Sequence, residues 1–480
     1  MIHPMQWSIL AVALALTAGC GGPPAPDGRS EAAAKPTPER PPAATAPTGF
    51  EIPVEYHTLD NGLKVVLSED HTAPVATVAV YYHIGFRNEP RDRTGFAHLF
   101  EHMMFQGSNN LGKMEFIQLV QGLGGVLNGS TRFDFTNYFE IVPAHRVETA
   151  LWAEADRMRS LQVTQDNLVN QQGVVKNEVR VNVLNQPYGG FPWLDLPQYA
   201  NENWYNAHNF YGDLADLDAA TLDDVRSFFE TYYAPSNAVV VVAGDIDPAA
   251  TLEQVRKYFG DIRSVSQPKQ PDISEPRQEK EKRATRADPL APRPGLAFAY
   301  HVPKRGTPEH YAMTLLSSIL VEGEDSLLHQ KLVKEKGYAG DVGGGINLLG
   351  NAFNYEGPML WTAYLIHDPE HSADEIMADV DAVVATLVEK PVDPAILRRA
   401  IVKFRSGHYD ALASGFSRAD LLASYALFDD NPAGVNDIEA GVRAVTPELL
   451  QSTAREYLRP GNRTVLVLEA GAGSGKTEGE

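Results

Sequence analysis

The sequence predicts an α+β protein of two similar domains, each a mostly antiparallel sheet packed with helices. The chain has 480 residues, more than one hydrophobic core usually organises. Strand-like and helical runs are mixed within each half, as in α+β domains. The segment at 166–180 also aligns with the segment at 393–407, where VVK falls on IVK. This alignment indicates an internal repeat, and therefore two domains of one kind.

Composition and charge narrow the class of protein. Hydrophobic residues make up 43% of the chain and aromatic residues 9%, which is typical of a globular protein. The 62 acidic residues outnumber the 41 basic ones, and the formal net charge is -21. Binding to nucleic acid requires a basic surface, so we expect no nucleic-acid partner.

The first 20 residues have the pattern of a lipoprotein-type signal peptide. The apolar run at 7–16 is too short to span a bilayer, and Thr-Ala-Gly-Cys follows it, ending at Cys20. This ending resembles a bacterial lipobox, although Thr17 stands where Leu is usual and no Lys or Arg precedes the run. The alternative is an ordinary secretory signal with an incidental cysteine. We expect export to the bacterial cell envelope, a lipid anchor on Cys20 as the sole membrane attachment, and a location facing the periplasm or at the outer membrane. The Pro/Ala-rich stretch at 21–49 is a predicted tether.

The elements of the first half follow from about residue 50. The run at 57–70 carries an Asn-Gly turn between two strand-like stretches, and 73–85 is a third strand candidate. The apolar run at 237–246 has the pattern of a buried strand. Helical stretches are expected between them, at 95–106, 113–123, 145–160 and 165–184.

A polar, proline-rich stretch at 264–294 separates the two halves, and its later part, 281–289, is a candidate edge strand of the second. The helix expected at 95–106 corresponds to the segment at 311–323. We therefore predict a first domain at 50–263, a linker at 264–274, a second domain at 275–470 and a flexible tail at 471–480.

The segment GFAHLFEHMMFQG carries the chemistry. It places His98 and His102 four residues apart, so on a helix both imidazoles lie on one face and can bind one metal ion, with Glu101 beside them. His-x-x-Glu-His is the inverted form of a common zinc-protease motif. The helix is apolar on nearly every side and is expected to be buried, where unpartnered polar groups cost several kcal/mol. A divalent metal removes that cost. The alternative is a histidine pair satisfied by backbone carbonyls.

A catalytic zinc site usually has three protein ligands and one open position, so a third ligand is expected. Glu178 is the best candidate. We expect its helix to be buried along the side that carries it. The alternative is a surface glutamate on a helix that faces the other way. The residues expected to share its face are Gln171, Val174, Val175 and Val181.

The motif at 98–102, followed after 75 intervening residues by Glu178, resembles the pitrilysin/insulinase family of zinc peptidases (M16). The two-domain bacterial type is similar to the subunits of mitochondrial processing peptidase. The segment GSTRFDFTNYFEIVP at 129–143 and the segments DRMRSL and VVKNEVR fit the same family. The resemblance implies two homologous domains that form half of a clamshell, and a zinc endopeptidase that cleaves extended or unfolded polypeptides in an enclosed chamber. It also implies one Zn²⁺ per chain, held by His98, His102 and Glu178, with Glu101 as the general base.

Substrate is expected to lie along an exposed strand edge and to extend the sheet. The candidate edge is GGVLNGST at 124–131, and Asn128 is a candidate contact to the peptide backbone. The alternative for Asn128 is a turn residue.

The second half departs from the family pattern. Thr314, Ser317 and Ser318 stand where the motif would be, and Arg405 stands at the third ligand. Many relatives also have an Arg and a Tyr in a segment like LREKxGLAY, where this chain has Val333 and Gly340. Gln171 likewise stands where many relatives have a second glutamate.

The absence of the Arg/Tyr pair affects which partner chain we expect. The resemblance implies a dimer, and we expect a heterodimer in which a related chain supplies the Arg/Tyr pair, with a homodimer as the second choice. The alternative is that Lys334 or Tyr338 takes the place of the pair. Two other functions compete with a peptidase: a non-catalytic scaffold or assembly subunit of the same fold, and a lipoprotein that delivers zinc. The scaffold has no use for all four site residues, and the delivery protein has no use for Glu101.

Overall fold

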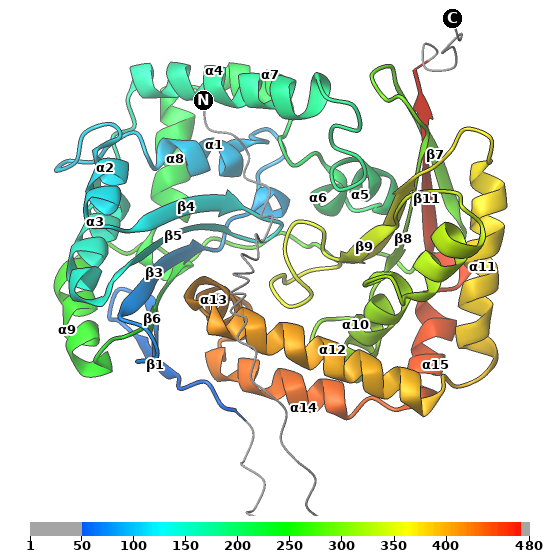
Figure 1. Cartoon of the computed structure of the whole chain (residues 1–480). Helices are drawn as coiled ribbons and strands as arrows, with labels where there is room; N and C mark the ends of the chain where they lie inside the picture. The colour runs from blue at the N-terminus through cyan, green and yellow to red at the C-terminus, as the bar shows by residue number, and fades with distance from the viewer. Residues whose placement is uncertain (1–49, 472–480) are drawn as a thin grey trace, which may run out of the picture. The chain divides into compact units, whose positions relative to one another are not determined.

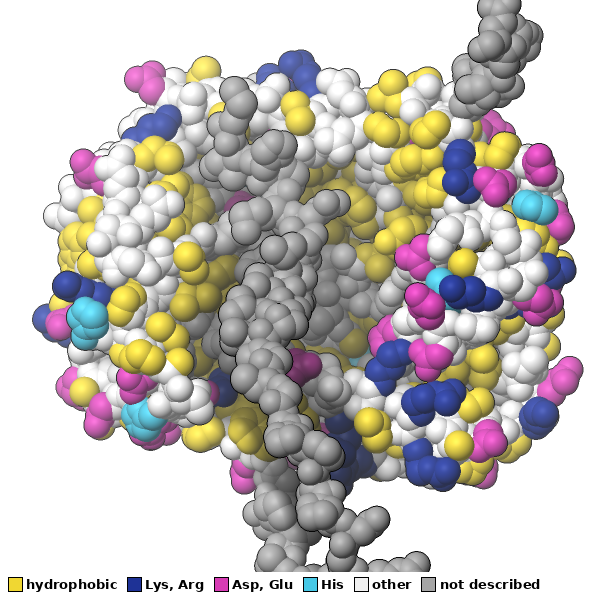
Figure 2. Space-filling view, viewed as in Figure 1, with side chains coloured by type: hydrophobic (Ala, Val, Ile, Leu, Met, Phe, Trp, Pro, Cys, Tyr) yellow, Lys and Arg dark blue, Asp and Glu magenta, His cyan; other side chains and the backbone are white. Residues whose placement is uncertain are grey.

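The computed structural model describes residues 50–471. The predicted signal peptide, Cys20, the tether and nearly all of the tail lie outside the described residues. Within the described part, no helix is both long and apolar enough to cross a bilayer. Figure 2 shows acidic and basic side chains interspersed on the visible face, so the net negative charge does not gather into one patch there.

The first half of the chain builds a six-stranded sheet with the strand order β1-β2-β6-β3-β5-β4 (Figure 1). Neighbours in this sheet are antiparallel except for β2 and β6, which run parallel. The candidate edge strand of the sequence is β4, and it does lie at an edge. The strands are β1 Glu55–Thr58, β2 Lys64–Glu69, β3 Val75–Tyr82, β4 Val126–Thr131, β5 Thr136–Pro143 and β6 Ala238–Gly244.

The second half repeats this arrangement in a five-stranded sheet with the order β7-β11-β8-β10-β9. Its one parallel pair, β7 with β11, occupies the place of β2 with β6. The two sheets therefore share strand order and strand direction, which confirms the predicted α+β class and the internal repeat. The domain boundaries stay a prediction. The strands are β7 Lys282–Asp288, β8 Gly295–His301, β9 Gly343–Ile346, β10 Leu360–Ile366 and β11 Arg463–Ala470.

Helices form where the sequence shows helical periodicity, and most begin at a residue whose side chain caps the first turn. Thr164, for example, accepts a hydrogen bond from the backbone amide of Asn167 at the start of α4. In the first half the longer helices are α1 Phe96–Met103, α2 Glu115–Gly122, α3 Val147–Ser160, α4 Gln165–Val179, α5 Asp195–Ala200, α8 Leu222–Tyr232 and α9 Pro248–Phe259. In the second half they are α10 Pro308–Val321, α11 Ala373–Glu389, α12 Pro394–Ala413, α13 Gly415–Asp429 and α15 Pro447–Tyr457.

The two halves exchange helices. Alternate residues of the first sheet, such as Val240 and Val242, pack against α1, α3 and α9 of the same half. The residues between them, such as Val239 and Val241, pack against Leu422 on α13 of the second half. In return, Leu196 on α5 of the first half packs on the second sheet (Figure 1). Each sheet is therefore buried on one face by its own half and on the other face by the opposite half.

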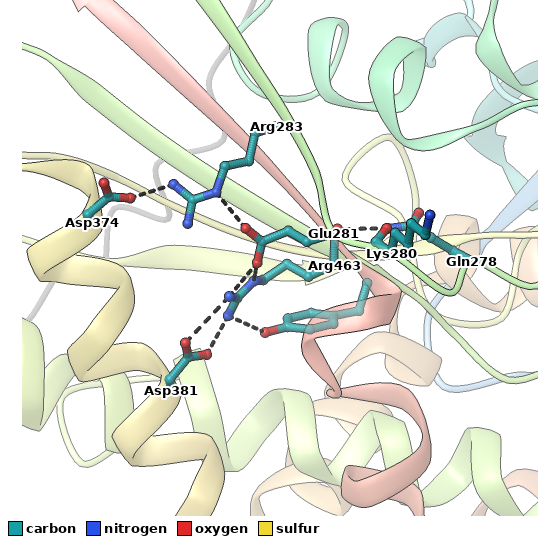
Figure 3. Close-up of polar contacts among 8 residues, drawn as sticks. Gln278, Lys280, Glu281, Arg283, Asp374, Asp381 and Arg463 are labelled. Carbon is teal, nitrogen blue, oxygen red and sulfur yellow. Dashed lines mark hydrogen bonds and ion pairs between the residues drawn. The ribbon is translucent and has the colours of Figure 1, made fainter.

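A buried arginine fixes the predicted edge strand of the second sheet. Arg463, at the start of β11, is 3% exposed and lies 2.5 Å from a carboxylate oxygen of Glu281 next to β7. It also pairs with Asp381 on α11, while Arg283 of β7 contacts both Glu281 and Asp374 (Figure 3). These ion pairs connect β7 to β11 and α11, which explains why so polar a strand holds its place.

Candidate metal centre

The helix α1 presents the motif because its start is fixed from two sides. Gly95 adopts a left-handed conformation at the N-cap, with φ of 81°, where a side chain is strained. The carboxylate of Glu89, which is fully buried, accepts hydrogen bonds from the backbone amides of Gly95 at 2.8 Å and Ala97 at 2.6 Å. An acceptor here satisfies the free N–H groups of the first turn and favours the helix dipole. The phenol of Tyr138 donates to the carbonyl oxygen of Phe100 at 3.0 Å and holds the middle of the helix.

The three predicted ligands come together. The Nε2 atoms of His98 and His102 lie 3.7 Å and 3.2 Å from the two carboxylate oxygens of Glu178. One donor atom from each of the three residues lies within 4.8 Å of the others, and the two imidazole rings are nearly perpendicular. Two imidazoles and one carboxylate are a donor set that zinc accepts, and three ligands leave a position open. In the described part of the chain, no other group of His, Cys, Asp and Glu has this arrangement.

Glu178 reaches the histidines from the last turn of α4. Gln171 and Val175 are buried on its side, as expected, but Val174 and Val181 are 41% and 48% exposed. The prediction that these two share the buried face was therefore wrong. Val174 lies at the margin of the stripe, and beyond Val179 the helix widens into a π-turn over Arg180–Leu184, which shifts the phase of the residues that follow.

Charge and burial set the protonation of the cluster. Burial lowers the pKa of His98. Burial also acts to lower the pKa of His102, but the hydrogen bond to Glu178 and the charges of Glu101 and Glu178 outweigh it, so this pKa is raised. For Glu178 burial acts in the upward direction, and the bond from His102 with the two nearby imidazoles lowers the pKa overall. An ionised Glu178 and a neutral His98 are the forms that bind a metal cation.

Glu101 lies on α1 between the two histidines, and the sequence did not indicate what holds its side chain. The hydroxyl of Thr131 on β4 donates a hydrogen bond to its carboxylate at 2.8 Å. Thr131 is 2% exposed. The contact connects the edge strand to the predicted base, across 30 residues of sequence.

Two further side chains at the cluster were not predicted as parts of it. Gln171, about two turns before Glu178 on α4, lies beside His102 and acts to raise the pKa of that histidine, so it stands behind a ligand although it is not the glutamate of many relatives. Tyr211 lies against His98 with the ring centroids 5.1 Å apart. Burial, followed by the charges of Glu178 and Glu101, raises the pKa of this tyrosine. Residue type alone gave no signal for Tyr211, because its contact arises from a separate loop.

Asn128 lies apart from the cluster. It is exposed on β4, and its side-chain oxygen accepts a hydrogen bond from the backbone amide of Gly129 at 2.9 Å. Side chains alternate along a strand, so Asn128 points to the face opposite Thr131. A contact between Asn128 and substrate stays a prediction.

The second half holds ordinary structural residues at the corresponding positions. Thr314, Ser317 and Ser318 are buried in α10, and Arg405 forms an ion pair with Glu439 at 2.6 Å.

The two candidate substitutes for the Arg/Tyr pair at 332–340 already have partners within this chain. The phenol of Tyr338 is committed to Asp379 at 2.6 Å and its ring is buried. Lys334 lies at the surface and pairs with Glu324.

Comparison with known families places these observations in context. Residues 64–188 match the model described as insulinase, peptidase family M16, and residues 219–403 match the model described as the peptidase M16 inactive domain. The first match contains His98, Glu101, His102 and Glu178. The second begins after the cluster and covers the end of the first half and much of the second.

Relatives and solved structures agree with this match. The chain is 27% identical to the zinc protease PqqE of Helicobacter pylori over 424 residues, which cover 86% of this chain and 92% of that protein. It is also 27% identical to a probable mitochondrial-processing peptidase subunit beta of Arabidopsis thaliana, over 43% of this chain and 39% of that one. A crystal structure of a protease from Helicobacter pylori aligns with a TM-score of 0.81 at 27% identity, covering 87% of this chain and all of that chain. A peptidase M16 inactive domain from Pseudomonas fluorescens shares the fold, with a TM-score of 0.76 at 17% identity, 87% of this chain and 98% of that one. With both family models matched in order and the metal cluster inside the first, the chain belongs to the M16 peptidase family.

Proposed function

We propose that the protein is a zinc-dependent endopeptidase that hydrolyses extended peptides or unfolded polypeptides. The observation that carries the proposal is the convergence of His98, His102 and Glu178 on one point with Glu101 beside them. Relatives named as zinc proteases support it. A scaffold subunit is the competing function, because the match over 219–403 is to an inactive domain. That match begins at residue 219, after all four site residues, so it does not weaken the case for the metal site.

In the proposed reaction His98, His102 and Glu178 hold the metal, which supplies a Lewis acid for the scissile carbonyl and lowers the pKa of a water molecule. Glu101 takes the proton from that water, and the water oxygen bonds to the carbonyl carbon. The same carboxylic acid then donates its proton to the leaving nitrogen as the carbon–nitrogen bond breaks. Thr131 keeps the carboxylate of Glu101 in place through both transfers.

The substrate is proposed to pair with the edge of β4. This strand ends the first sheet, so its outer backbone groups are free to bond an extended chain. Thr131 at its end contacts Glu101, and a peptide on this edge therefore passes the predicted base.

The proposal is tested by measuring zinc content and cleavage of a quenched peptide for matched variants. Glu101→Gln should retain zinc and lose activity by roughly 100- to 10,000-fold, the usual contribution of a general base. Glu178→Ala should lose zinc as well, and stripping the wild type with a chelator should reproduce that loss. Glu253→Gln, at an exposed position on α9, is the control. Zinc binding by Glu178→Ala as tight as in the wild type would exclude Glu178 as the third ligand.

We also propose that the chamber is completed by a second, related chain. Val333 and Gly340 leave the Arg/Tyr positions without a functional side chain, and Tyr338 is committed elsewhere. Relatives include a chain named as a subunit, and a structure titled as the first half of a periplasmic protease shares the fold at a TM-score of 0.69. A heterodimer supplies the pair from the partner, whereas a homodimer does not. The isolated zinc-loaded chain should gain activity when the sister chain is added. Full activity of the chain alone, unchanged on addition, contradicts this division of labour.

The location is a separate proposal that rests on the sequence. Export and a lipid anchor on Cys20 are supported by the apolar run and the Thr-Ala-Gly-Cys ending. One acyl chain anchors weakly, so stable attachment requires several. Cys20→Ser should move the protein from the membrane fraction to the soluble fraction or block its processing. Unchanged fractionation rejects the anchor.

A further inference from the structure

Among the aromatic rings of the described residues that contact His98, the ring of Tyr211 carries a hydroxyl. Its ring lies against His98, 5.1 Å between centroids and nearly perpendicular, and its side chain is 6% exposed. The ring therefore lies directly beside a predicted metal ligand.

The hydroxyl has no structural partner in the described part of the chain. No protein group forms a hydrogen bond to it. It is also not one of the fully buried polar atoms that lack a partner, so it is in contact with solvent. It consequently faces space that water or substrate can occupy. Phe210 and Trp193, packed beside it, already provide an apolar wall, so a phenylalanine would serve packing equally well.

The backbone at Tyr211 is held firmly. Its amide donates to the side chain of Asn209 at 2.8 Å. The next residue, Gly212, has φ of 67°, and a Cβ there would lie 2.3 Å from the backbone of Thr94 and Gly95. The turn is thus pressed against the start of α1. A group fixed in this way needs little reordering when substrate binds.

We propose that the hydroxyl of Tyr211 donates a hydrogen bond to the carbonyl oxygen of the scissile peptide bond, from the zinc-binding chain itself. The inference rests on the proposed peptidase function. As the water oxygen bonds to the carbonyl carbon and its proton moves to Glu101, the π electrons of the carbonyl move onto the oxygen. Tyr211 keeps its proton and bonds to the oxygen more strongly as the negative charge develops. When the proton on Glu101 reaches the leaving nitrogen, the carbonyl re-forms and the carbon–nitrogen bond breaks.

Kinetics of the zinc-loaded full chain test this role. Tyr211→Phe retains the ring against His98, so zinc content and KM should stay at wild-type values, while kcat should fall roughly 100-fold, as for the loss of one donor to a developing oxyanion. Tyr205→Phe removes the same atom from the same segment at a distance from the cluster and should leave kcat unchanged. Wild-type kcat in Tyr211→Phe overturns the proposal, and so does loss of zinc, because the residue is then structural.

Binding of a phosphinic peptide, a stable tetrahedral analogue, gives a readout that does not depend on turnover. Calorimetry should show roughly 100-fold weaker binding of this peptide to Tyr211→Phe than to the wild type, because the hydrogen bond is strongest to the tetrahedral oxygen. The matching unmodified peptide, measured on the Glu101→Gln background with and without Tyr211→Phe, should bind with similar affinity. Equal binding of the phosphinic peptide to wild type and Tyr211→Phe overturns the proposal. If the Glu101→Gln variant cleaves peptide normally, the proposed function fails, whatever the result for Tyr211.

Discussion

Thr131 shows how a single hydroxyl contributes to the proposed chemistry. It donates to Glu101 at 2.8 Å from a position that is 2% exposed. Thr131→Val keeps the shape but removes the donor, so kcat should fall roughly 10- to 100-fold with zinc retained, the usual effect of losing a supporting contact. Thr131→Ser retains the hydroxyl and should stay near wild type. Equal kcat for the valine and serine variants would show that the hydrogen bond does not matter.

The sequence located the two histidines at residue scale because their spacing within one helix is local, whereas the choice of Glu178 came from the family resemblance. His98 and His102 are one turn apart on one helix, and such a pattern survives any tertiary arrangement. Thr131, Gln171 and Tyr211 reach the same point from a strand, a second helix and a loop. Their residue types are common everywhere, so only the folded backbone distinguishes them from ordinary threonines, glutamines and tyrosines.

At the scale of elements, Gly212 controls how closely its loop approaches the start of α1. Gly212→Ala places a methyl group 2.3 Å from the backbone of Thr94 and Gly95 and strains a residue with φ of 67°. The left-handed conformation alone costs about 1–2 kcal/mol, and the contact adds to it, so thermal stability and zinc affinity should both fall. Gly173→Ala is the matched control. It lies within α4 with no atom within 4 Å of its Cβ, and there alanine should stabilise by about 1 kcal/mol. Thermal unfolding and zinc titration of both variants test this prediction. A Gly212→Ala variant as stable as the wild type would contradict the close contact between this turn and the start of α1.

Most elements that line the site could be predicted, since strand alternation and helical periodicity are local. The helix expected at 95–106 forms over Phe96–Met103, and the strand expected at 237–246 forms over Ala238–Gly244. The π-turn after Val179 could not be predicted, because it depends on the packing of the last turn of α4 rather than on residue preference. The exposure of Val181 follows from the same cause, whereas Val174 lies before the π-turn at the margin of the buried stripe.

At the scale of the whole molecule, the exchange of α5 and α13 makes each half depend on the other. A fragment covering 50–263 would expose the face of the first sheet that α13 buries, including Val66 and Tyr81. We expect this fragment to aggregate alone and to become soluble and bind zinc when 275–470 is co-expressed. Co-purification and zinc analysis measure the outcome. A soluble, zinc-binding 50–263 fragment would show that the α13 face is dispensable.

The position of α13 also determines when the first sheet can fold during synthesis. This helix, Gly415–Asp429, is made after most of the molecule, and until it emerges the first sheet has an apolar face without a cover. Early segments therefore cannot reach a finished core during synthesis. Under the export proposed above, this late completion favours a chain that is still loosely folded when it enters a translocation channel, and the structure would be completed only after nearly all of the polypeptide has crossed the membrane.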